Sequence, residues 1–328
     1  MSFSIILNQI PVINNFLERP IPVILHGMEL YLGTWQISPS DGFWTDQNRG
    51  ESEKTVSFAI KNGISGYDCA QSYGHGQAEQ TLGKILRRHP EASFKVDTKI
   101  MPTAKDPEEL AVQSARRLGH AIDCLYLHWP RTGFDNRGFL ERMATLKDRG
   151  LVRKVGVCNL PLKDLEAFVS DGLVMDRVQR PYSLLWPAGF DQELEFCRSH
   201  GIEMAVYSPT GMGLLSGRYR GPEDLNDARK DLFCFDPICR SQYLDLLELV
   251  SSLARSKGVS NTKVALSWAK LKKPDIVLIG ARSTTQLQEN LSADVRFTET
   301  EVRDLDLAAR RLSDKADGIC TNIFSYNW

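Results

Sequence analysis

The sequence predicts an α/β protein folded as a (β/α)8 barrel, with a short N-terminal β-hairpin and extra helices after the seventh and eighth strands. Two observations support this fold class. Short apolar or β-branched runs alternate with longer segments of helical periodicity. Six consecutive expected strands also begin roughly 22 to 30 residues apart, which is the length that a parallel strand and its crossover helix need. Eight such units close into a barrel, and an open doubly wound sheet is the structural alternative.

The length and composition agree with one barrel. The chain has 328 residues, of which 42% are hydrophobic and 25% charged, as is ordinary for globular proteins. Two average domains would fit this length, but barrels of 250 residues or more form a single domain. We therefore expect one domain over residues 1–328.

The expected elements follow in order along the chain. Strands are expected at 31–35, 64–68, 94–99, 122–127, 152–157, 174–179, 202–206 and 275–280. Helices are expected at 51–62, 77–88, 107–118, 138–149, 162–170, 191–200, 241–257, 262–271, 284–292 and 299–312.

Two further segments have expected places in this barrel. Segment 21–27 is interpreted as the hairpin that closes the barrel bottom. Segment 207–240 is a long loop at the carboxyl end of the seventh strand, where barrels hold their ligands.

Charge and cysteine usage narrow the function classes. The 40 Lys and Arg balance 41 Asp and Glu, which argues against general nucleic-acid or membrane binding. The seven cysteines form no CxxC pair and no zinc spacing with histidine, so we expect no metal. No apolar run reaches the length of a membrane span, and the N-terminal segment lacks a signal-peptide pattern. We expect a cytoplasmic protein that acts on a small molecule; the oligomeric state is not indicated.

Four polar residues follow or end neighbouring strands. Asp68 ends the second expected strand, Tyr73 lies five residues further on, Lys99 ends the third strand and His128 follows the fourth. Each has an ordinary explanation by itself: a helix cap, a packed ring, a solvated charge or a structural imidazole. Because strand ends of a barrel meet at one mouth, we expect these four side chains to lie together.

Such a group suits proton transfer at a substrate oxygen. A phenol has a pKa of about 10 and is a weak acid at neutral pH. A neighbouring ammonium lowers that pKa, so Tyr73 beside Lys99 would exchange a proton with an alcohol or carbonyl oxygen. Asp68 would keep Lys99 charged, and His128 would align the oxygen. No side chain delivers hydride, so this chemistry requires a nicotinamide or similar cofactor.

The constellation resembles the aldo-keto reductases. The matching segments are GTW (33–35), YDCAQSYGHGQAEQTLGKIL (67–86), DTK (97–99), LYLHWP (125–130), GVCNL (156–160), VQRPYSLL (178–185), YSPTGMGLLSGRY (207–219) and GARSTTQLQENL (280–291). Each segment is weak alone, but eight in the family's order cover residues from about 30 to 310. The resemblance implies a TIM barrel that reduces aldehydes or ketones, with Tyr73 as general acid/base and Asp68, Lys99 and His128 completing the tetrad.

The resemblance also implies NADP(H) bound across the barrel mouth without a GxGxxG fingerprint, and none follows a strand here. Amide groups of Asn159 and Gln179 suit the nicotinamide carboxamide, and Tyr207 suits stacking on its ring. Arg282 precedes an expected helix N-terminus, a pattern that attracts a 2′-phosphate. The remaining expected cofactor contacts are Gly33, Thr34, Trp35, Asp68, Ser208, Pro209, Thr210, Gly213, Gly280, Gln286, Glu289 and Asn290.

The substrate side is expected to be aromatic. Trp35 and Trp129, with Tyr73 and His128, are the expected substrate contacts, and Trp44 and Trp186 are further candidates. Aromatic walls suit an apolar or planar carbonyl compound. We see no basic cluster that would require an anionic substrate.

Three residues depart from the family pattern. Cys158 replaces a serine before the amide asparagine, which puts the carboxamide contact there in doubt; Ile279 replaces a frequent proline; and Cys69 stands where Thr or Ala is common.

Two other functions fit parts of the pattern. A barrel aldolase would use Lys99 as a Schiff-base lysine, but this requires a neutral amine beside Asp68. A regulatory or redox-sensing protein would bind NADP(H) with little turnover, and the retained tetrad argues against that function.

Overall fold

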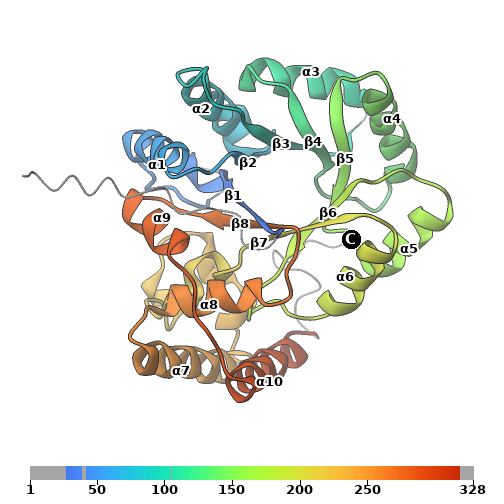
Figure 1. Ribbon diagram of the computed structural model, residues 1–328. Helices are drawn as coiled ribbons and strands as arrows, with labels where there is room; N and C mark the ends of the chain where they lie inside the picture. The colour runs from blue at the N-terminus through green and yellow to red at the C-terminus, as the bar shows by residue number, and fades with distance from the viewer. Residues whose placement is uncertain (1–26, 39–41, 104, 318–328) are drawn as a thin grey trace, which may run out of the picture.

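The structure is a computed structural model that describes residues 27–38, 42–103 and 105–317. Its eight strands are all parallel and form one closed barrel in sequence order (Figure 1). The predicted barrel is therefore confirmed, and the open-sheet alternative is wrong. The expected hairpin at 21–27 falls, apart from Gly27, outside the described residues. The strands are β1 (Glu29–Gly33), β2 (Gly66–Asp68), β3 (Lys95–Ile100), β4 (Ile122–Leu127), β5 (Val152–Cys158), β6 (Arg177–Pro181), β7 (Glu203–Tyr207) and β8 (Ile276–Gly280).

Helices surround the barrel, as Figure 1 shows. Their N-termini carry the caps that the sequence offers: Asn48, Asp106 and Ser283 each accept a hydrogen bond from a main-chain N–H of the first turn. The expected extra helices are present, because α7 and α8 precede β8 while α9 and α10 follow it. The bounds are α1 (Arg49–Lys61), α2 (Gln77–Leu86), α3 (Pro107–Leu118), α4 (Asn136–Asp148), α5 (Leu162–Ser170), α6 (Phe190–Ser199), α7 (Arg240–Lys257), α8 (Asn261–Lys270), α9 (Thr284–Leu291) and α10 (Glu299–Ala316).

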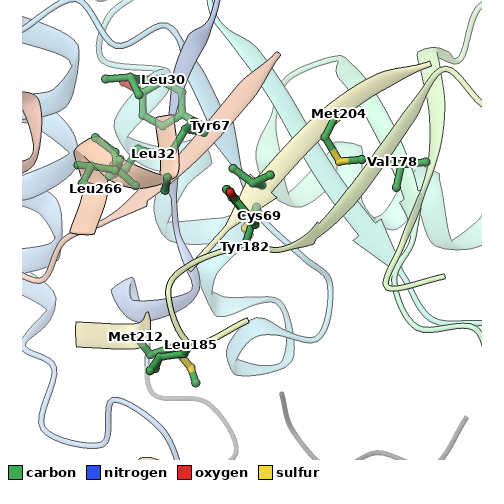
Figure 2. Close-up of a cluster of buried hydrophobic side chains, with 14 of the residues drawn as sticks. Leu30, Leu32, Tyr67, Cys69, Val178, Tyr182, Leu185, Met204, Met212 and Leu266 are labelled. Atoms are coloured by element: carbon green, nitrogen blue, oxygen red, sulfur yellow. The ribbon is translucent and has the colours of Figure 1, made fainter. Parts of the chain in front are cut away.

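The outward face of each strand packs against the helices. Leu32 of β1, Val178 of β6 and Met204 of β7 are each fully buried in one large apolar cluster, part of which is drawn in Figure 2. Because side chains alternate along a strand, the residues next to each of these three along its strand point into the barrel. No helix in the described part of the chain is long and apolar enough to cross a membrane.

Two glycines make room for tyrosine rings inside the barrel. A Cβ on Gly66 would lie 2.1 Å from a ring carbon of Tyr31, and one on Gly156 would lie 2.7 Å from the ring of Tyr126. Both rings are buried. The missing side chains on β2 and β5 therefore let large rings from β1 and β4 fill the interior.

A buried ion pair crosses the same layer. Arg177 on β6 donates to Asp97 on β3 at 2.6 Å and to Glu203 on β7 at 2.7 Å. Burial raises the pKa of Asp97 to about 7, although the Arg177 guanidinium opposes this shift. The layer directly beneath the barrel mouth is therefore charged as well as packed.

Candidate active site

The tetrad positions follow from the alternation of side chains along the strands. Side chains two residues apart on a strand share a face, so Lys99 lies on the same inward face of β3 as Asp97. In the same way, His128 at the end of β4 shares the inward face with Tyr126. The last inward positions of adjacent strands therefore reach the mouth together, one layer above the Asp97–Arg177 pair.

Lys99 connects the expected tetrad. Its Nζ donates to Asp68 Oδ1, to the Cys69 main-chain oxygen at 2.8 Å and to the Tyr73 hydroxyl at 3.3 Å. Lys99 is only 1% exposed and Asp68 only 2%. The His128 ring lies edge-on to the Tyr73 ring, with 5.7 Å between centroids. The four predicted residues thus lie together at one end of the barrel.

The protonation of Tyr73 differs from the sequence expectation. Burial raises the pKa of its phenol above the ordinary value, and the Lys99 ammonium only partly opposes this shift. Desolvation therefore outweighs the ammonium that was expected to lower the pKa. The phenol stays protonated at neutral pH, so it can donate a proton.

Lys99 and His128 differ in charge state. Burial is the largest single effect and disfavours the Lys99 ammonium, but Asp68, Tyr73 and Cys158 together outweigh it, so the pKa of Lys99 is raised. Burial lowers the pKa of His128 well below its ordinary value, and the Lys99 charge adds to this effect. Lys99 is thus a cation and His128 a neutral ring. A charged, carboxylate-bound lysine disfavours the Schiff-base alternative.

The two predicted amide residues are held by members of the tetrad. Gln179 Nε2 donates to Asp68 Oδ2 at 2.8 Å, and Asn159 Nδ2 donates to the His128 main-chain oxygen at 3.3 Å. The Tyr207 hydroxyl donates to Asn159 Oδ1 at 2.7 Å. These bonds fix the orientation of both amides and of the Tyr207 ring at the ends of β5, β6 and β7.

Backbone strain gathers at the same mouth. Asn159, Ser208 and Met212 have φ values of 59°, 54° and 54°, which non-glycine residues seldom adopt. All three line the cavity described below. Such strain is retained where the surrounding structure needs that backbone path, most often at functional sites.

The turn from β8 into α9 also borders the site. Ser283 caps α9, and the Arg282 main-chain N–H donates to Gln286 Oε1 at 2.8 Å. Asn290 Nδ2 donates to the Gly280 oxygen at 2.9 Å. Two expected cofactor contacts, Gln286 and Asn290, therefore also hold this turn in shape.

One cavity of about 670 Å³ joins these parts. Every expected cofactor and substrate residue lines it, and so do all tetrad members except Lys99, which is buried beneath it. The two further tryptophan candidates differ in position. Trp44 lines the cavity, but Trp186 is not among the lining residues and lies near Phe233. The aromatic wall thus includes Trp35, Trp44 and Trp129.

Several arginines that line the cavity are not among the site residues expected from the sequence. Arg229 is buried, forms an ion pair with Asp227 at 2.8 Å and lies 4.7 Å from the Trp44 ring centroid. Arg131 and Arg218 also line the cavity. The only signal for Arg218 and Arg229 was their place in the long loop after β7, which does not show where side chains point.

The three departures from the family pattern are not among the residues that line the cavity. Cys158 packs with Cys124 and Tyr126 inside the barrel and is not among the lining residues. Ile279 points outward into the apolar cluster. Cys69 contacts the tetrad through its main-chain oxygen, which any residue type would supply.

A closed parallel barrel with an acid, a phenol, an ammonium and an imidazole beside one cavity at its mouth defines the class of barrel enzymes. Within this class, the chain belongs to the aldo/keto reductase family, whose profile matches residues 29–310. The protein is therefore an oxidoreductase of that family.

Individual relatives agree with this assignment. The chain is 28% identical over 290 residues to the NADH-specific methylglyoxal reductase of Escherichia coli (strain K12), covering 80% of this chain and 88% of that protein. It is 25% identical over 351 residues to the chloroplastic pyridoxal reductase of Arabidopsis thaliana, covering 95% and 93%. The glycerol dehydrogenase AKR11B4 from Gluconobacter oxydans has the same fold, with a TM-score of 0.73, 24% identity and coverage of 89% and 94%.

Proposed function

We propose that this protein reduces an aldehyde or ketone to the alcohol with NADPH, and that Tyr73 is the general acid. The observation that carries this proposal is the hydrogen bond between the Tyr73 hydroxyl and the buried Lys99 ammonium. This bond lies at the wall of a cavity whose lining residues extend from β1 to α9. A protonated phenol next to a fixed cation is suited to protonate a carbonyl oxygen.

The donor set of the cavity fits a dinucleotide. Fixed amides of Asn159 and Gln179 and the Tyr207 ring stand at one end, where a nicotinamide would meet them. The Arg282 guanidinium and the N-terminus of α9 stand at the other, and this cation at a helix start favours a 2′-phosphate. When bound, the nicotinamide supplies the hydride that no side chain provides.

The chain's own residues manage the proton and the substrate oxygen. Tyr73 donates its phenolic proton to the oxygen as the carbonyl carbon is reduced, and Lys99 stabilises the phenolate that this leaves. Asp68 holds Lys99 in place. The Ser72 hydroxyl lies 3.3 Å from His128 Nδ1. A neutral His128 that accepts this bond carries its proton on Nε2, from which it hydrogen-bonds the substrate oxygen.

The substrate end favours planar or apolar carbonyl compounds. The rings of Trp35 and Tyr73 lie 6.0 Å apart, and Trp129 adjoins His128 with 6.0 Å between centroids. These rings form walls beside the reacting oxygen, and we infer that they bind the substrate by apolar contact.

The described cysteines support a reducing location. Cys69, Cys124, Cys158, Cys197, Cys234 and Cys239 are all free and buried. We infer a cytoplasmic protein, because free thiols persist in reducing compartments.

The test mixes purified protein with NADPH and a panel of aromatic and aliphatic aldehydes, and follows the loss of NADPH absorbance. We expect turnover by the wild type and a loss of about 100-fold or more in kcat for Tyr73→Phe, which keeps the ring and removes the proton. Full activity in Tyr73→Phe contradicts the assigned role. Tight NADPH binding with no turnover of any carbonyl indicates the redox-sensing alternative.

A further inference from the structure

The guanidinium expected to bind the 2′-phosphate already holds a carboxylate. Arg282 Nη2 donates to Asp46 Oδ1 at 2.7 Å, and its Nε donates to Gln47 Oε1 at 2.8 Å. Gln47 Nε2 returns a bond to the Arg282 main-chain oxygen at 3.3 Å. The loop between β1 and α1 is thus fastened to the start of α9.

The two partners of Arg282 are held differently. Gln47 Nε2 also lies 3.0 Å from the Ser52 hydroxyl, which donates to the Ile37 main-chain oxygen at 3.0 Å. Asp46 is held less firmly, because its side chain is 56% exposed while that of Arg282 is 25% exposed. Gln47 therefore keeps Arg282 oriented without Asp46, whereas Asp46 chiefly adds a negative charge.

That charge has opposite effects on the two nicotinamide dinucleotides. A 2′-phosphate on Arg282 brings a dianion close to the Asp46 carboxylate, and the two anions repel each other. An unphosphorylated ribose offers a 2′-hydroxyl instead, which donates to a carboxylate. Arg282 therefore favours the cofactor with a 2′-phosphate, and Asp46 favours the cofactor without one.

We propose that Asp46 is a specificity-determining residue that weakens binding of a 2′-phosphate at Arg282 and accepts a hydrogen bond from an unphosphorylated ribose, so that NADH competes with NADPH for this site. The proposal rests on the proposed function, because it requires the dinucleotide to place its adenosine ribose at Arg282.

The charge state of Asp46 supports this role. The hydrogen bond from Arg282 lowers the pKa of the Asp46 carboxyl, with Arg229 adding a smaller effect in the same direction. Asp46 is therefore anionic throughout the working pH range. Because the group is exposed, salt screens its repulsion of a phosphate.

The test measures binding in the absence of any carbonyl compound. Dissociation constants of NADPH, NADH, 2′,5′-ADP and 5′-AMP are determined by calorimetry for the wild type and Asp46→Asn. We expect the variant to bind NADPH and 2′,5′-ADP about two- to fivefold more tightly, as for a partly screened surface charge. Binding of NADH and 5′-AMP should weaken, because an amide oxygen is a weaker acceptor for the ribose hydroxyl than a carboxylate. Unchanged binding of both contradicts this part of the proposal. The gain for the phosphorylated ligands should shrink at high salt.

A matched control separates the local effect from net charge. Glu51→Gln makes the same charge change on α1, where Glu51 pairs with Lys54 at 2.7 Å, whereas Asp46 pairs with Arg282. We expect it to leave the ratio of NADPH to NADH affinity unchanged. Adding Arg282→Gln to Asp46→Asn should remove the gain for 2′,5′-ADP.

The outcomes that overturn the proposal are distinct. Weaker NADPH binding by Asp46→Asn shows that Asp46 positions Arg282 for the phosphate instead. An equal change for all four ligands shows a general charge effect. No binding of either dinucleotide by the wild type removes both this proposal and the proposed function. Binding with the expected changes but without carbonyl turnover supports the role of Asp46 and contradicts the proposed function alone.

Discussion

The Lys99 ammonium lies 3.3 Å from the Tyr73 hydroxyl, while its other contacts are the Asp68 carboxylate and the Cys69 main-chain oxygen. An ammonium has three N–H donors, so these contacts use all of them. The cation is thus fixed in direction, and one donor points to the phenol that is proposed to release a proton.

Replacing Lys99 with methionine tests this arrangement. The expected result for Lys99→Met is a loss of about 100-fold or more in kcat with saturating NADPH, because the phenolate formed on Tyr73 loses its stabilising charge. Lys257→Met is the control, since Lys257 pairs with Glu301 at 2.9 Å between α7 and α10. Circular dichroism at the assay temperature shows that both variants are folded. A kcat within threefold of the wild type would argue that Lys99 only supports the fold.

The pKa directions predict a broad plateau in the pH profile of reduction. Tyr73 acts in its protonated form and burial raises its pKa above 10.0, so activity is lost only as the pH rises through that raised value. His128 acts as a neutral ring and burial lowers its pKa below 6.5, so activity falls only below that lowered value. We expect kcat/KM to be level between pH 6.5 and about 9. A tenfold decline per pH unit between 7 and 9 would contradict a protonated Tyr73.

The buried pair beneath the site predicts a pH-dependent stability defect. Arg177→Met leaves the Asp97 carboxylate buried without its cation, at a cost of about 3 kcal/mol near pH 8. The pKa of Asp97 is already raised to about 7 and rises further in this variant. The folded state then binds more protons than the unfolded state above pH 4, so the free energy of unfolding falls as the pH rises.

Urea unfolding at pH 5 and pH 8 measures this defect. We expect Arg177→Met to be closer to the wild type at pH 5 than at pH 8. Adding Asp97→Asn removes the titrating group and should flatten the difference between the two pH values. A defect of equal size at both pH values in the single variant would show lost packing rather than an uncompensated carboxylate.

The close approach at Gly66 predicts a steric defect. A Cβ there would lie 2.1 Å from the Tyr31 ring, so Gly66→Ala must displace that ring and should cost roughly 1–3 kcal/mol. Gly33→Ala is the control, because its Cβ would meet its nearest neighbour, the Ile279 oxygen, at an ordinary 3.7 Å. Denaturant midpoints compare the two variants. Tyr31→Leu combined with Gly66→Ala should recover part of the loss; no recovery would place the strain elsewhere.

Local patterns determine much of the fold. Alternating apolar runs and helical periodicities predict the eight strands and their helices, because each pattern reflects which face of an element is buried. The boundaries are less accurate: the sixth strand begins at Arg177 rather than 174, and β1 ends at Gly33, so Thr34 and Trp35 follow it. Strand ends depend on pairing with neighbours, which a local window does not contain.

The sequence by itself determined which residue types stand at the strand ends, and therefore that Asp68, Lys99 and His128 meet at one mouth, because barrel closure brings those strand ends together. The path of the turn after β2 decided that the Tyr73 hydroxyl reaches Lys99. Only the tertiary structure decided the charge states of the site residues and which side chains contact them. The raised pKa of Tyr73, the burial of Cys158 away from the cavity and the fastening of Arg282 to Asp46 depend on how much water is excluded and on which loops cross the mouth. Both are set by side chains far apart in the chain, and so no local pattern records them.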